Sequence, residues 1–140
     1  MYQVREVLEG MAARLAAENV TDDEVQGLKA LLVQHQQQSE LQTGKGYYQE
    51  EGDLDFHYKV ILGSHNKQLI NLICGQLYHL VRMYRCQFGM HSPRASRAFN
   101  EHANIIQAIS DRDGELAELL MRRHIAASRK NIESKIAQAK

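Results

Sequence analysis

The chain has 140 residues, of which 44% are hydrophobic and 24% are charged. This is the size and composition of one ordinary globular domain. Lysine plus arginine and aspartate plus glutamate each number 17, so the formal net charge is zero. A neutral chain lacks the basic surface of a nucleic-acid-binding domain, and no apolar run approaches the roughly 20 residues of a membrane-spanning helix.

The cysteines and the start of the chain bear on where the protein works. Cys74 and Cys86 fall on what we predict to be one helix, where they cannot bridge each other. Two unpaired thiols and the absence of a signal-peptide pattern favour a reducing compartment, the cytoplasm. The first residues already follow a helical pattern, which we interpret as the start of a fragment cut from a longer protein.

A 3.6-residue apolar period runs through almost the whole chain and predicts an all-α fold. A first helix is expected over residues 2–18, with a buried face made of Val4, Leu8, Met11 and Leu15. Short connections favour an antiparallel bundle of six to seven helices.

A capping box marks the start of the second helix. Thr21 can cap the helix, and Glu24 can reach back to the Thr21 amide. The residues that follow in helical register are Val25, Leu28, Leu32 and His35. A break is expected around residues 44–46, where two glycines flank a lysine.

The middle of the chain predicts two more helices. One is expected over residues 47–62 and ends at a break over residues 63–66. The next, over residues 70–88, is the most apolar and is the expected centre of the bundle. Ser92 as N-cap and Pro93 at the first helical position predict the start of the fifth helix.

The last two predicted helices each carry a histidine on the apolar face. On the fifth helix His102 is in register with Phe99, Ile106 and Ile109. After a break at residues 111–114, His124 on the sixth is in register with Ala117, Leu120 and Ala127. A buried imidazole must satisfy two ring nitrogens, and failing to do so costs roughly 1–3 kcal/mol. Residues 133–140 are expected to fray.

Four residues on three predicted helices are candidate metal ligands. Asp53 and His57 are four residues apart, so on a helix they share a face and can bind one ion. With His102 and His124 they would form a site for a divalent transition metal, leaving two positions open on a six-coordinate ion. Singly, each has a plainer interpretation as a solvated pair, a hydrogen-bonded core histidine or a charge near a helix C-terminus. Convergence cannot be read from sequence, so both interpretations stay open.

The remaining polar candidates are expected to be ordinary surface residues. The histidines near predicted ends or loops, His35, His65 and His91, are expected to be exposed. Glu101 lies beside His102 but points about a quarter turn away, so we expect it on the surface.

Four short motifs resemble the FCD domain, the all-α effector-binding and oligomerisation domain of FadR-subfamily GntR transcriptional regulators. The matching segments are residues 5–9 with 12–17, 53–57, 63–69, and 102–113 with 117–125. The resemblance covers about residues 2–132. It implies one FCD-like ligand-binding and dimerisation domain over residues 1–140, with a winged helix-turn-helix DNA-binding domain before the present Met1.

The resemblance also implies a ligand set. The family's metal ligands fall by position on Asp53, His57, His102 and His124. In the family the metal is zinc, nickel or manganese, and the effector is usually a small organic acid that contacts it; we expect zinc first. Arg5 and Arg82 are our candidates for pairing with the effector carboxylate, because arginine can bind a carboxylate with two N–H groups. Either could instead be a surface arginine.

Three functions are compatible with these features. The leading hypothesis is a sensor rather than an enzyme: an effector bound at the metal shifts the helices, and through them the DNA-binding domains of a homodimer. The alternative is a metal-dependent hydrolase on a helical scaffold, because a metal with open positions can activate water. A third possibility is a purely structural dimerisation bundle, without metal or ligand pocket.

Overall fold

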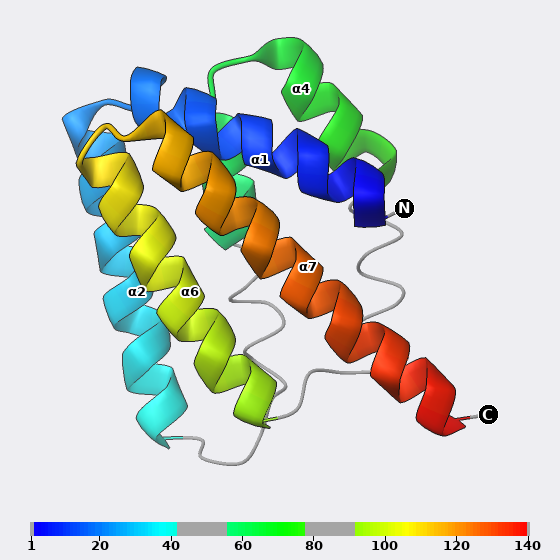
Figure 1. The fold of residues 1–140 in the computed structure, drawn as a ribbon. Coiled ribbons are helices and arrows are strands. Elements are labelled where there is room, and N and C mark those ends of the chain that lie inside the picture. The colour runs from blue at the N-terminus through cyan, green and yellow to red at the C-terminus, as the bar shows by residue number, and fades with distance from the viewer. Residues whose placement is uncertain (1, 42–55, 78–91, 140) are drawn as a thin grey trace.

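The computed structural model describes residues 2–41, 56–77 and 92–139 (Figure 1). The elements are α1 (Tyr2–Asn19), α2 (Asp22–Leu41), α4 (Lys67–Leu72), the π-helical turn η1 (Ile73–Leu77), α6 (Ser92–Ser110) and α7 (Gly114–Ala139), with a further helical segment over residues 56–63. None of these residues forms a strand, which confirms the all-α prediction. In this part of the chain no helix has both the length and the hydrophobicity needed to cross a membrane.

The long helices run antiparallel, as predicted. α6 and α7 form a hairpin, and α1 lies along α7 in the opposite direction (Figure 1). Two ion pairs set this direction: Arg122 Nε is 3.4 Å from Glu6 Oε1 near the start of α1, and Arg14 Nε is 2.5 Å from Glu118 Oε1 near its end. α2 packs against α6 on the other side of the hairpin.

The buried face of α1 is only partly the predicted one. Leu8 and Leu15 are partly buried and pack against a small core cluster with Ala12, Ile61 and Ile73. Val4 and Met11 are 56% and 40% exposed. The residues that α1 buries are Arg5, Glu9, Gly10, Ala12, Ala13, Ala16 and Ala17. The small side chains let the backbone of α1 approach α7 closely: a Cβ added at Gly10 would lie 2.6 Å from Arg122 Cγ. The rule that larger apolar residues mark the core therefore placed Leu8 and Leu15 correctly and Val4 and Met11 wrongly.

The helix boundaries follow the local signals closely. Thr21 N donates to Glu24 Oε1 at 3.0 Å, and Glu24 N donates to Thr21 Oγ1 at 3.1 Å, which confirms the capping box. The break at residues 63–66 is also confirmed, with Asn66 Oδ1 accepting from Leu69 N as the cap of α4.

The structure differs from two of the sequence predictions about these elements. α7 continues to Ala139, whereas residues 133–140 were expected to fray. His35 was expected to be exposed but is buried. The predicted break at 44–46, the first part of the helix over 47–62 and the last part of the helix over 70–88 lie outside the described residues.

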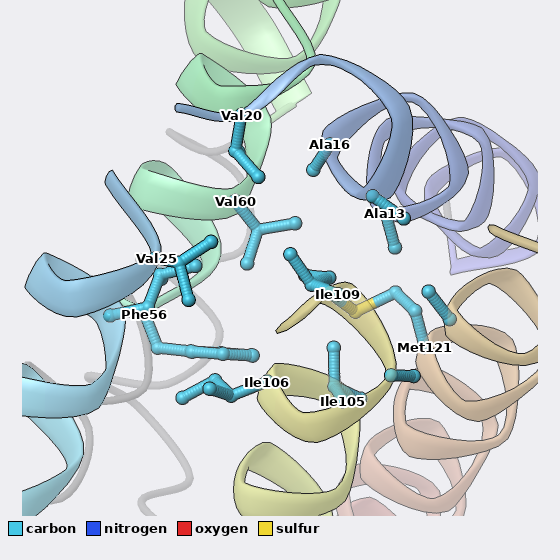
Figure 2. Close-up of a cluster of buried hydrophobic side chains, with 14 of the residues drawn as sticks. Ala13, Ala16, Val20, Val25, Phe56, Val60, Ile105, Ile106, Ile109 and Met121 are labelled. Carbon is cyan, nitrogen blue, oxygen red and sulfur yellow. The ribbon is translucent and has the colours of Figure 1, made fainter. Parts of the chain in front are cut away.

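The hydrophobic core lies where α1, α2, residues 56–63, α6 and α7 meet (Figure 2). Its largest fully buried members are Phe56, Val60, Ile105, Ile109, Met121 and Ile125. The Phe56 ring stacks on the His102 ring, with 4.0 Å between the centroids. The aromatic stack thus joins the apolar core directly to the histidines.

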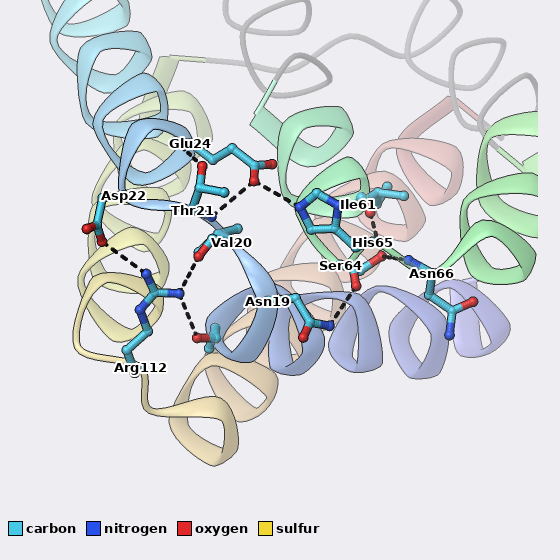
Figure 3. A network of polar contacts seen from close by, with 11 residues as sticks. Asn19, Val20, Thr21, Asp22, Glu24, Ile61, Ser64, His65, Asn66 and Arg112 are labelled. Carbon is cyan, nitrogen blue, oxygen red and sulfur yellow. Dashed lines mark hydrogen bonds and ion pairs between the residues drawn. The ribbon is translucent and has the colours of Figure 1, made fainter.

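A polar network joins the α1–α2 connection to the α6–α7 turn and to the break at residues 63–66 (Figure 3). Arg112, in a left-handed conformation with φ 62°, donates from Nη1 to Val20 O at 2.5 Å and to Ala17 O at 3.4 Å. Asn19 Nδ2 donates to Ser64 O at 2.9 Å. The carbonyls at the C-terminus of α1, which lack partners within the helix, are satisfied by a side chain from the α6–α7 turn.

Candidate metal centre

Three of the four predicted metal ligands converge in the interior. His57 comes from the helical segment 56–63, His102 from α6 and His124 from α7, and all three are buried. His124 Nε2 lies 2.9 Å from His57 Nε2 and 3.3 Å from His102 Nε2. One nitrogen from each ring falls within 4.8 Å of the other two.

The α6–α7 hairpin explains how two of these histidines meet. His102 precedes the turn at residues 111–113 by about as far as His124 follows it, so antiparallel packing places them side by side. Each also lies among large buried side chains of its own helix, which orient that face inward: Ile105 and Ile109 on α6, and Met121 and Ile125 on α7.

Two carboxylates hold the outer nitrogens of two of these rings. Glu9 Oε1 is 2.5 Å from His57 Nδ1, and Glu101 Oε1 is 2.6 Å from His124 Nδ1. Burial alone would raise the pKa of Glu9, but Arg5 and His57 beside it lower that pKa to about 2. An ionised carboxylate only accepts hydrogen bonds, so the contact with Glu9 requires a proton on His57 Nδ1.

This arrangement fits a divalent transition metal. With Nδ1 protonated, a neutral imidazole presents a lone pair at Nε2. With both Nδ1 atoms protonated, the Nε2 atoms of His57 and His124, 2.9 Å apart, need a cation between them, either a shared proton or a metal ion. Adjacent donors at about 2.0–2.1 Å from one ion are separated by about 2.8–3.4 Å in octahedral or tetrahedral geometry. The two close Nε2 separations, 2.9 and 3.3 Å, fall in this interval.

The other predicted site residues have different outcomes. Asp53 and Arg82 lie outside the described residues, so their roles remain predictions. Arg5 is fully buried and is ion-paired through Nε with Glu9, so it is not a surface arginine. It is linked to the centre through Glu9, whose other oxygen contacts His57.

Sequence reasoning missed both carboxylates. Glu101 was expected on the surface of its own helix, but its side chain reaches across to His124 on α7. A signal for Glu9 was present, because Arg5 and Glu9 are an i,i+4 pair in register with the alanines of α1. No comparable signal exists for Glu101, because its partner lies on another helix.

A cavity of about 330 Å³ lies away from this centre, between α2 and residues 56–63. It is lined by Val20, Asp23, Glu24, Gly27, Leu28, Lys59 and Leu62. None of the three histidines is among these residues, so the cavity does not belong to the candidate metal centre.

The fold and this centre together define an all-α domain built around a buried cluster of histidines from three helices. The family model described as FCD domain matches residues 1–127. The chain therefore belongs to the FCD domain family, as its motifs predicted.

Two relatives agree with this assignment. The chain is 26% identical over 125 residues to the Nta operon transcriptional regulator of Aminobacter aminovorans, covering 89% of this chain and 56% of that protein. The solved structure of E. coli McbR/YncC has the same fold, with a TM-score of 0.77 at 22% identity over 95% of this chain and 66% of that one. The chain thus spans less than two thirds of each. Of the two, the Aminobacter protein is named as a transcriptional regulator.

Proposed function

We propose that this chain is the effector-sensing domain of a GntR-type transcriptional regulator, and that it binds one divalent metal at His57, His102 and His124. The observation that carries the proposal is the convergence of three buried Nε2 atoms, with the 2.9 Å pair backed by carboxylates at both Nδ1 atoms. Zinc suits such an imidazole-rich site, and nickel and manganese are the alternatives.

Asp53 is proposed as the fourth ligand, because it precedes His57 by four residues and would share its face if the helix extends that far. On an ion that accepts six ligands, four protein ligands leave two positions. A small carboxylate could occupy them and also meet a positive charge. Arg5 is one candidate for that charge, because it is buried beside Glu9, which contacts His57, and Arg82 is the second.

The proposed output is a change in DNA binding by a separate domain of the same protein. We assign DNA binding to an N-terminal winged helix-turn-helix domain of the full-length regulator, because this chain is neutral and spans 56% of the curated regulator that it matches. Effector binding would shift the helices of a cytoplasmic homodimer, and through them the DNA-binding domains. A coupling of this kind requires different contacts between the effector and the two states.

A thermal-shift screen of small organic acids tests this proposal. With metal present, a few acids should raise the melting temperature, because a ligand that binds only the native state stabilises it by RT ln(1 + [L]/Kd). Those shifts should disappear after chelation and in Asp53→Ala, and they should weaken when the contributing arginine is replaced. Shifts that survive complete metal removal would show that the acid binds elsewhere.

A further inference from the structure

We propose that Glu9 and Glu101 are positioning residues of the metal centre: each accepts the Nδ1 proton of one ligand histidine and so turns that ring's Nε2 lone pair toward the shared point. The inference rests on the metal binding proposed above. It adds two side chains that would not touch the ion, and it assigns the tautomer of two of the three imidazoles.

The contact between Glu101 and His124 shows the arrangement most simply. Glu101 and His102 are neighbours on α6, but they contribute to the centre in different ways. His102 points its own Nε2 to within 3.3 Å of His124 Nε2, while Glu101 holds the opposite nitrogen of the same His124 ring at 2.6 Å. Two consecutive residues of α6 therefore fix both the position and the orientation of one histidine on α7.

Glu9 acts on His57 in the same way, from α1. Its Oε1 lies 2.5 Å from His57 Nδ1, and its other oxygen is ion-paired with Arg5. The side chains of Arg5, Glu9 and His57 are all fully buried. The arginine compensates the carboxylate charge in the interior, so that Glu9 can stay ionised and accept the Nδ1 proton.

In both cases the carboxylate and the histidine belong to different elements. The hydrogen bond on one ring nitrogen determines which tautomer is present, and therefore which nitrogen can bind a metal. Without the carboxylate, the proton can move to Nε2 and block the coordinating lone pair. The packing of α1 and α6 is thus what prepares His57 and His124 for the ion.

Nuclear magnetic resonance of the metal-free protein tests the tautomers directly. Long-range ¹H–¹⁵N correlations at neutral pH should show the proton on Nδ1 for His57 and His124. In Glu101→Ala, the proton of His124 should move to Nε2, while His57 should keep its tautomer. A parent protein in which His124 carries no proton on Nδ1 would overturn the proposal, whatever its metal affinity.

Zinc affinity, measured by competition with a chromophoric chelator, tests the consequence. Removal of such an outer hydrogen-bond partner costs about 10- to 100-fold in metal affinity. Glu101→Ala should fall in this range, and Glu101→Gln should lose less, because its amide oxygen can still accept the Nδ1 proton. Glu118→Gln is the matched control: Glu118 is also a part-buried carboxylate, but it pairs with Arg14, so zinc affinity should stay at the parent value.

Glu9 needs a charge-balanced variant. Glu9→Gln alone would leave a buried arginine without its carboxylate and could unfold the domain. The double variant Arg5→Met with Glu9→Leu removes both charges and the acceptor for the Nδ1 proton, so it should bind zinc more weakly than the parent. Unchanged zinc affinity in this variant would contradict the role of Glu9.

The two readouts separate this proposal from the proposed function. A parent that binds no zinc but shows Nδ1-protonated His57 and His124 would refute the metal centre and keep the positioning role of the carboxylates. A parent that binds zinc, together with a Glu101→Ala variant of unchanged affinity, would refute the positioning role and keep the centre.

Discussion

Replacing His102 by alanine perturbs the centre at the imidazole that is joined most directly to the hydrophobic core. The ring stacks on Phe56 at 4.0 Å, and its Nε2 lies 3.3 Å from His124 Nε2. The substitution therefore has two separate effects. It leaves a cavity in the core, which lowers stability with or without metal, and it removes a ligand, which matters only when metal is bound.

The magnitude of the second effect follows from linkage. At free metal one hundred times above the Kd, the parent gains roughly 2.7 kcal/mol. For a domain of this size, about 4 °C per kcal/mol converts this into a rise of about 11 °C in Tm. Loss of a direct ligand should weaken binding at least as much as the roughly 100-fold that loss of an outer partner can cost. At the same metal concentration the gain then falls to about 0.4 kcal/mol, or about 2 °C.

Differential scanning calorimetry with and without a chelator isolates the stabilisation by metal, because each variant is compared with its own metal-free form. His65→Asn is the control. His65 is 51% exposed and lies outside the centre, and asparagine tolerates its φ of 54°. This control should keep the full shift. If His102→Ala also keeps the full shift, the assignment of His102 as a ligand is wrong.

Four further predictions concern stability, each measured by urea unfolding. Arg112→Ala should cost about 1.5–3 kcal/mol, because the guanidinium satisfies carbonyls at the end of α1; a loss below about 0.5 kcal/mol would contradict that role. Phe56→Ala should cost about 3–5 kcal/mol, since the ring is buried in the core, and a cost typical of surface substitutions would contradict it. Thr21→Ala should cost about 1 kcal/mol through the lost cap. The hydrogen bond from the Thr21 amide lowers the pKa of the Glu24 carboxyl. The stability that this hydrogen bond contributes is therefore fully present above pH 4.5 and is lost as the pH falls through the lower pKa of the folded state. Glu24→Gln should remove this loss of stability at acid pH.

Local signals in the sequence were sufficient for most helix boundaries. The capping box at Thr21, the break at residues 63–66 and the start of α6 at Ser92 all lie where short-range patterns predicted them. Such signals work because a helix end must satisfy its own backbone groups with nearby side chains. The face that a helix buries depends instead on its neighbours, which is why Val4 and Met11 were wrongly placed in the core.

The candidate site also combines residues that one helical pattern predicts with residues that depend on contacts between elements. His102 and His124 were recognisable because an imidazole on an apolar face needs partners, and the structure brings both to His57. The roles of Glu9 and Glu101 depend on contacts between elements, which a single helical pattern does not contain. Asp53 and Arg82, outside the described residues, are still predicted from sequence alone.

The alanine-rich face of α1 has a consequence for how that helix is held. Small side chains form shallow ridges, which interlock less deeply with the grooves of a neighbouring helix than large side chains do. The position of α1 therefore depends in part on polar contacts along its length, among them Arg14 with Glu118 and Glu9 with His57. One of these contacts ends at the histidine cluster. We therefore expect a change in the orientation of the His57 ring to displace α1 along its own axis.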